Sequence, residues 1–225
     1  WAAGGRMGTA LPSKEQSLFK TVVKLYETKQ YKKALKSADL ILRKFPNHGE
    51  TLAMKGLTLN SLDRKVEAYD LVRTGLRNDL KSHVCWHVFG LLYRSDRDYR
   101  EASKAYLQAL RIDKNNVQIL RDLALLQIQI RDYDGFESTR RNLLNQKPAQ
   151  KNNWIGFALA HHLNGNYTTA LQVLDAYNET VVRNSTDAEE MYEASELLLY
   201  KAFIMEEGAD YQRGFDHIES VRSLV

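Results

Sequence analysis

Apolar residues recur at spacings of three and four along most of the chain, beginning near Ser13. Leu18, Val22 and Leu25 fall on one side of a helix, and the alanines and isoleucine between 34 and 41 repeat the pattern after a short polar break. Such spacing is typical of amphipathic helices. The sequence Pro-Asn-His-Gly at 46–49 then predicts a chain break. The first 48 residues therefore predict two helices joined by a turn.

The best-defined helix pair is the segment 82–110, SHVCWHVFGLLYRSDRDYREASKAYLQAL. It follows the tetratricopeptide (TPR) pattern W-x₂-L-G-x₂-Y…A-x₃-F, with Phe89 for Leu and Tyr106 for Phe. Gly90 and Ala102 lack bulk where the two helices are expected to cross, so the backbones can approach closely. Because one such pair leaves an apolar side exposed, it needs a neighbour on each side.

The same register recurs every 34 residues, which predicts an all-α, right-handed TPR superhelix of about six helical hairpins. Small residues at the eighth and twentieth positions of the repeats carry this register, with Val22 and Phe136 as departures. We expect residues 1–12 to be disordered and 13–225 to form the array. The expected repeats lie near 15–48, 49–82, 83–116, 117–150, 151–178 and 195–225, with a loop or helix extension at 178–194.

Composition agrees with a helical array and excludes several classes of protein. The 225 residues are 44% hydrophobic and include three prolines. No run of 18 or more apolar residues occurs, so no membrane partner or span is expected. A single cysteine, Cys85, cannot form an internal disulfide and agrees with a reducing compartment. No nucleotide-binding or nucleophile-elbow motif is present, so we expect no catalytic and no cofactor-binding residues.

Charge is concentrated in the first hairpin. The formal net charge is +4 for the chain, yet residues 13–48 alone carry nine Lys or Arg against three Asp or Glu. Charged helix faces are usually only solvated, but several of these lysines share a helix side. We favour contact with ribosomal RNA or another polyanion, whose phosphates such a surface attracts. The candidate residues are Lys20, Lys24, Lys29, Lys32, Lys33 and Lys36.

A second candidate surface is an apolar row on the first helix of each repeat, which lines the concave face of a TPR stack. The ninth position is apolar in five repeats, and Phe19 adds to the row at a fifth position. The row can bind a partner helix or an extended peptide. It can equally be packing between neighbouring helices, and the sequence leaves both readings open. The candidate groove residues are Phe19, Val23, Leu57, Leu91, Leu125 and Leu159.

His83 and His87 stand four residues apart and so share a helix side, as zinc ligands do. No carboxylate accompanies them nearby in sequence, and we favour a structural role and no metal site. His161 and His162 are adjacent and face different ways, which indicates packing or groove positions. Cys85, beside Trp86, is expected to be a buried, unreactive thiol.

Several segments resemble one family beyond the general TPR pattern. GETLAMKGLTLN (49–60), LRNDLKSHVCWHVFGLLYRSDRDYREA (76–102) and ILRDLALLQIQIRDYDGF (119–136) are closely similar to the auxiliary subunit of the NatA N-terminal acetyltransferase complex, as are LPSKEQSLFK (11–20) and WIGFALAHHL (154–163). The resemblance covers essentially residues 11–225 and is greatest to plant members.

This resemblance implies a cytoplasmic, ribosome-associated scaffold that holds a separate catalytic acetyltransferase subunit. That partner, not this chain, would use acetyl-CoA to acetylate nascent N-termini. The resemblance also implies that this chain is the N-terminal quarter of a longer protein, and that its basic hairpin contributes a ribosome contact. Two alternatives stay open: a general TPR adaptor that binds a partner helix or peptide, and an enzyme detectable with acetyl-CoA and a peptide.

Overall fold

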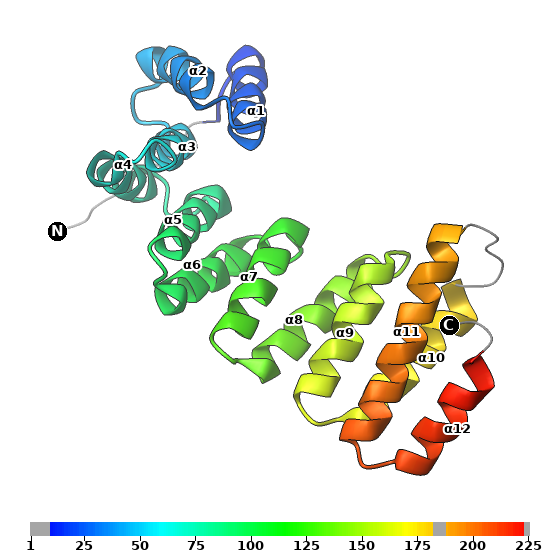
Figure 1. Cartoon of the computed structure of the whole chain (residues 1–225). Helices are drawn as coiled ribbons and strands as arrows, with labels where there is room; N and C mark the ends of the chain where they lie inside the picture. The colour runs from blue at the N-terminus through cyan, green and yellow to red at the C-terminus, as the bar shows by residue number, and fades with distance from the viewer. Residues whose placement is uncertain (1–9, 182–187, 223–225) are drawn as a thin grey trace. The chain divides into compact units, whose positions relative to one another are not determined.

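The computed structural model describes residues 10–181 and 188–222, with side chains at 10–178 and 195–222. Every regular element in these ranges is an α-helix, and they follow one another along the chain as twelve labelled helices (Figure 1). The all-α fold class predicted from the sequence is confirmed. The chain divides into two compact units, residues 1–130 and 131–225, which are described separately below.

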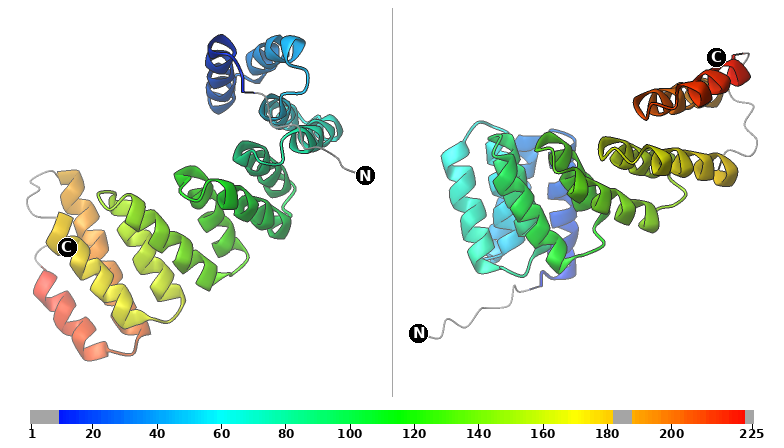
Figure 2. Two further views of the ribbon diagram at one scale, coloured as in Figure 1. Left: turned by 180° about the vertical axis from the view of Figure 1, so that it is seen from behind. Right: turned by 90° about the horizontal axis from the view of Figure 1, so that it is seen from below.

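Unit 1 contains three complete hairpins and one further helix. Neighbouring helices pack in sequence order, and α3 also packs against α1 and α5 (Figure 2). The helices are α1 (Ser13–Glu27), α2 (Tyr31–Lys44), α3 (Gly49–Asn60), α4 (Lys65–Asn78), α5 (His83–Ser95), α6 (Tyr99–Ile112) and α7 (Val117–Gln129). The first helices of three successive hairpins thus begin 34 residues apart, at 49, 83 and 117.

The residue before each of these helices fixes its start. The side chains of His48, Ser82 and Asn116 accept hydrogen bonds from the backbone N–H three residues later, at 3.2 Å in each case. An accepting side chain at this place satisfies one of the N–H groups that the first helical turn leaves without a partner. The 34-residue interval is therefore marked by a repeated helix cap as well as by apolar residues.

The turn inside each hairpin also recurs in register. Lys29, Asp63, Arg97 and Arg131 all have a positive φ, between 58° and 63°, and the next turn has Gly165 at 73°. The left-handed conformation lets the chain reverse within two or three residues after the first helix. Four of these five positions carry a residue other than glycine, so the sequence alone gives no glycine signal for them.

The close approach predicted for Gly90 is present. A Cβ atom on this glycine would overlap the ring of Tyr106, which is completely buried between α5 and α6. Gly56 shows the same constraint, since its Cβ would lie 2.7 Å from the carbonyl oxygen of Ala68. Small residues at this position therefore let the paired helices come together around a large buried side chain.

Unit 2 continues the helical pattern with five helices that pack in sequence order. They are α8 (Tyr133–Gln146), α9 (Lys151–Leu163), α10 (Tyr167–Val181), α11 (Ala188–Glu207) and α12 (Tyr211–Val221). Their core is separate from that of unit 1 and is built around Ala158, Leu174 and Ile204. The boundary between the units lies inside the repeat expected at 117–150, because α7 belongs to unit 1 and α8 to unit 2.

One sequence expectation needs correction, and a second had two alternatives. Residues 1–12 are not disordered throughout, because Leu11 is 6% exposed and belongs to the apolar core of unit 1; residues 1–9 lie outside the described part. The interval 178–194 is helical on both sides of 182–187, which also lie outside the described part. Of the two alternatives for this interval, the described residues follow the helix extension, and α11 begins at Ala188, before the last repeat expected near 195.

Candidate interaction surfaces

The six candidate lysines all have exposed side chains, two on α1, one in the turn and three on α2. Two of the three acidic residues of this hairpin form ion pairs with lysines outside the candidate set. Glu15 pairs with Lys44 at 2.8 Å, and Asp39 pairs with Lys55 at 2.7 Å. The side-chain hydrogen bond from Lys44 is the main reason that the pKa of Glu15 is lowered. Among the described residues no carboxylate pairs with the six lysines, so their charge faces solvent.

The apolar row divides into buried and exposed members. Leu57 is 3% exposed and lies in the core of unit 1, so its side chain leaves no surface for a partner. Phe19, Val23 and Leu91 are half-buried against that core. Leu125 on α7 is 57% exposed. At Leu57 the apolar side chain serves packing between helices. At Leu125 the side chain is accessible, so binding of a partner in a groove stays open there.

Leu159 is the member of the row that lies in unit 2, on α9, and its side chain is half-buried. It is followed by His161 and His162, which are both buried. His162 bonds Tyr200 through Nδ1, at 3.0 Å, and Glu207 through Nε2, at 2.7 Å. His162 therefore packs inside unit 2 and ties α9 to α11, as the packing interpretation of this pair predicts.

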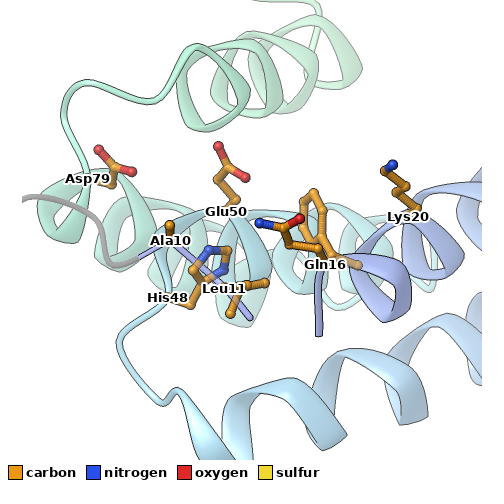
Figure 3. Close-up of a pocket in the computed structure, with 8 residues that line it drawn as sticks. Ala10, Leu11, Gln16, Lys20, His48, Glu50 and Asp79 are labelled. Atoms are coloured by element: carbon orange, nitrogen blue, oxygen red, sulfur yellow. The ribbon is translucent and has the colours of Figure 1, made fainter. Parts of the chain in front are cut away.

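A hollow of about 300 Å³, which no sequence motif had indicated, lies at the start of α1 and α3 (Figure 3). Phe19 and Lys20 contribute one side of it, while Glu50 and Asp79 bring two carboxylates. Glu50 accepts a hydrogen bond from the Ser82 hydroxyl at 2.9 Å. These groups come from repeat positions that share no motif, so only the stacking of the hairpins brings them together.

The ring of His48 forms part of the same hollow and meets the ring of Phe19 edge-on, with centroids 6.1 Å apart. Burial lowers the pKa of His48 below its ordinary value, and the nearby Glu50 and Asp79 oppose this only in part. The imidazole is therefore held neutral, which suits its role as acceptor for the backbone N–H of Thr51.

His87 takes part in a polar network rather than in a metal site. Its Nε2 lies 2.8 Å from Asp122 on α7, and Arg94 donates to the other oxygen of that carboxylate at 3.0 Å. Burial raises the pKa of Asp122, but hydrogen bonds led by His87 outweigh it and the net pKa is lowered. His83 lies 3.9 Å from Asp113 instead. Both histidines thus lie beside a carboxylate of this chain, and the absence of a metal site stays a prediction.

Cys85 is completely buried, and burial raises the pKa of its thiol to about 12. A thiol with so high a pKa is not a nucleophile near neutral pH. Within the described ranges, no group of three or more His, Cys, Asp or Glu is placed to hold a metal ion. In the same ranges, no helix combines the length and the apolarity needed to cross a bilayer.

Comparison with known proteins places these surfaces in context. A family model described as "Psidin, N-terminal TPR repeats region" matches residues 19–221. The chain is 58% identical over 212 residues to the N-terminal acetyltransferase A complex auxiliary subunit NAA15 of Arabidopsis thaliana, covering 94% of this chain and 24% of that protein. It is 55% identical over 219 residues to the human N-alpha-acetyltransferase 16, NatA auxiliary subunit, covering 96% of this chain and 25% of that one.

Solved structures give the same picture. A chain in the structure of Naa15/Naa10 bound to HypK-THB matches with a TM-score of 0.77 and 42% identity, over 94% of this chain and 32% of that chain. The Pseudomonas aeruginosa PilF structure matches with a TM-score of 0.63 but only 14% identity, over 93% of this chain and 91% of that chain, which shows the fold alone. The chain spans about a quarter of the length of the curated relatives. The resemblance to NatA auxiliary subunits is confirmed, and the chain belongs to the family of the Psidin N-terminal TPR repeats region.

Proposed function

We propose that this chain is the N-terminal part of a non-catalytic scaffold of the NatA N-terminal acetyltransferase complex. The observation that carries the proposal is identity of 55–58% to two NatA auxiliary subunits along nearly the whole chain. A similar chain has been solved in a structure of Naa15/Naa10, so a catalytic acetyltransferase subunit is the proposed partner. In this role the chain contributes stacked helical surfaces, and the partner performs acetyl transfer with acetyl-CoA.

The proposed partner can be tested with a catalytic acetyltransferase subunit and acetyl-CoA. The 225-residue chain alone should not acetylate a peptide N-terminus, because its sequence lacks the loop pattern with which acetyltransferases bind acetyl-CoA. A protein of the relatives' full length that contains this chain should form an active complex when it is co-expressed with the catalytic subunit. Turnover by the isolated chain, or failure of the full-length protein to retain the subunit, would contradict the proposal.

We further propose that the scaffold works in the cytoplasm and anchors the complex to the ribosome through the lysines of α1 and α2. Support comes from their exposure and from the pairing of Glu15 and Asp39 with other lysines. Changing Lys29, Lys32, Lys33 and Lys36 to Glu should strongly reduce co-sedimentation with ribosomes at moderate salt. Unchanged co-sedimentation of a folded variant would remove this surface from the proposal.

The exposure of Leu125 supports a second candidate, a general adaptor that binds a partner helix in its groove. Leu125→Asp should weaken partner capture and leave the helix content unchanged, because the side chain is already 57% exposed. Leu57→Asp is the contrasting variant, since Leu57 is buried in the core and an unpaired carboxylate there should unfold unit 1. If the Leu125→Asp variant still binds the partner as well as the unchanged chain does, this groove is not the binding site.

A further inference from the structure

The turn between α9 and α10 carries the one Asn-Gly pair of the sequence, Asn164-Gly165. Asparagine is chemically labile, and the residue after it decides how readily its side-chain amide is attacked. Gly165 holds the turn position with a positive φ, where the other described hairpin turns have a residue with a side chain. It is exposed, and a Cβ there would meet nothing within 4 Å. No side chain therefore shields its backbone nitrogen from the neighbouring asparagine.

The reaction open to this pair is spontaneous deamidation, which needs only water. The backbone nitrogen of Gly165 attacks Cγ of Asn164, so that a bond forms between these two atoms and the bond from Cγ to Nδ2 breaks. Nδ2 leaves as ammonia with the proton from the Gly165 nitrogen, and a five-membered succinimide ring remains. Water then opens one of the two ring carbonyls, which gives aspartate or isoaspartate at position 164.

The closed turn holds the reacting atoms apart. The ψ of Asn164 is 2°, which sets the Gly165 nitrogen on the side of the Asn164 nitrogen rather than on the side of Cβ. The Gly165 N–H donates to the carbonyl oxygen of His162 at 2.9 Å, and the Asn164 amide donates to Glu137 Oε2 on α8 at 3.0 Å. Both hydrogen bonds must break before the ring can close. The rate of deamidation is therefore set by how often the turn opens.

The hydrogen bond between Asn164 and Glu137 joins neighbouring repeats. Asn164 holds the fourteenth position of its repeat, and Glu137 holds the twenty-first position of the preceding one. Asp96 and Tyr69 hold the same two positions in unit 1, where the Tyr69 hydroxyl donates to Asp96 at 2.7 Å. In both places one donor and one acceptor tie a turn to the second helix of the preceding hairpin. The contact thus depends on opposite hydrogen-bonding roles at the two positions.

Deamidation removes the donor from this contact in unit 2. A carboxylate at position 164 would face Glu137 Oε2, so that two acceptors of like charge would meet. Arg141 donates to the other oxygen, Glu137 Oε1, at 2.7 Å and is already matched by that charge. His161 Nδ1 lies 3.6 Å from Oε2, but burial lowers the pKa of His161 and keeps the ring neutral. The product therefore repels α8 from the turn.

We propose that Asn164 is a site of spontaneous, irreversible modification that releases α8 from the turn between α9 and α10. The closed turn protects the amide, and each opening exposes it to attack by the Gly165 nitrogen. Once the carboxylate has formed, the open turn is favoured, so the contact between two repeats of unit 2 is lost. The inference is independent of the acetyltransferase partner and of the lysines of α1 and α2.

The site is tested by incubating the 225-residue chain at mildly alkaline pH and mapping its peptides by mass spectrometry. Deamidation raises the mass of a peptide by about 1 Da. Asn164 should convert before any other asparagine, and unfolding in guanidinium chloride should speed its conversion by at least about tenfold, because the turn is then open. Gly165→Ala should slow conversion in the unfolded chain, where the strain of the turn is absent.

Asn60, which is followed by Ser61, is the internal control for this measurement. Conversion of Asn60 as fast as that of Asn164 in the unfolded chain would overturn the assignment of the site. Equal rates at Asn164 with and without denaturant would overturn the protection by the closed turn.

The release of α8 is tested with variants that imitate the product. Asn164→Asp should speed hydrogen exchange in α8 and in the turn after α9. Asn166→Asp is the matched control, since it makes the same change of charge on an exposed side chain of the same turn, and it should leave exchange unchanged. Adding Glu137→Gln to Asn164→Asp should restore most of the protection, because the new amide can donate to the new carboxylate. Equal exchange in Asn164→Asp and the unchanged chain, or no recovery in the double variant, would overturn the release.

Discussion

Repeat position does not decide exposure for individual side chains. Leu57 and Leu125 hold the ninth position of their repeats, yet one is 3% and the other 57% exposed. The two side chains differ because their exposure depends on the helices that surround them. Within unit 1, α3 packs against α1, α4 and α5, whereas α7 packs against α6.

Gly165 offers a clean measure of backbone strain at a hairpin turn. Its φ is 73°, and a Cβ at this position would meet nothing within 4 Å. Gly165→Ala should therefore cost about 1 kcal/mol of unfolding free energy through the left-handed backbone alone. Chemical denaturation checks this. The reverse change at the next such turn, Ala209→Gly (φ 59°), should stabilise slightly, and a gain in stability from Gly165→Ala would contradict the explanation.

His48 predicts a dependence of stability on pH. Burial lowers its pKa in the folded chain, so the unfolded chain binds more protons just below the ordinary value of 6.5. Stability should thus fall as the pH drops from 7.5 to 5, and protonation would also remove the cap on Thr51 N–H. His48→Asn keeps a capping acceptor, as Asn116 does at the same repeat position, and should lessen the fall. Chemical denaturation of both proteins at pH 7.5 and pH 5 tests this. The His48→Asn variant should still lose some stability at pH 5, because burial also lowers the pKa of His161.

At the scale of helices, one carboxylate joins α5 to α7. Asp122 is 8% exposed and accepts hydrogen bonds from His87 and Arg94 of the preceding hairpin. Asp122→Ala should cost roughly 1–3 kcal/mol, because the two donors lose their shared acceptor. Equilibrium unfolding measures the loss. Gln118→Ala on the same helix face removes only the weaker 3.2 Å contact and should cost far less; equal losses would show that the network adds no specific stability.

Helix boundaries were predictable where caps and apolar spacing coincide. The starts of α3, α5 and α7 follow His48, Ser82 and Asn116, and all three are readable as polar residues before an apolar run. The start of α11 at Ala188 falls in the interval 178–194, where the sequence left a loop and a helix extension open, because this segment is rich in polar residues and lacks the 34-residue register. A helix that owes its extent to packing leaves no such local signal.

At the scale of the whole molecule, the two units have separate apolar cores. Leu92→Ala in unit 1 and Leu174→Ala in unit 2 each remove a completely buried leucine side chain and should cost about 2–5 kcal/mol. In a repeat array such losses act mainly on neighbouring repeats. Hydrogen exchange should therefore speed up in α4–α6 for the first variant and in α9–α11 for the second. Uniform acceleration across the chain in both variants would show a single cooperative unit.

By itself the sequence determined the helical class, the 34-residue register and the family, because apolar spacing and small residues at helix crossings are local properties. It also located the basic first hairpin, since charge is simply counted. Only the tertiary structure decided which apolar positions stay exposed and which acids neutralise which lysines. It alone placed Glu50, Asp79 and His48 around one hollow. These relations join residues some thirty positions apart, and they exist only once the hairpins have stacked.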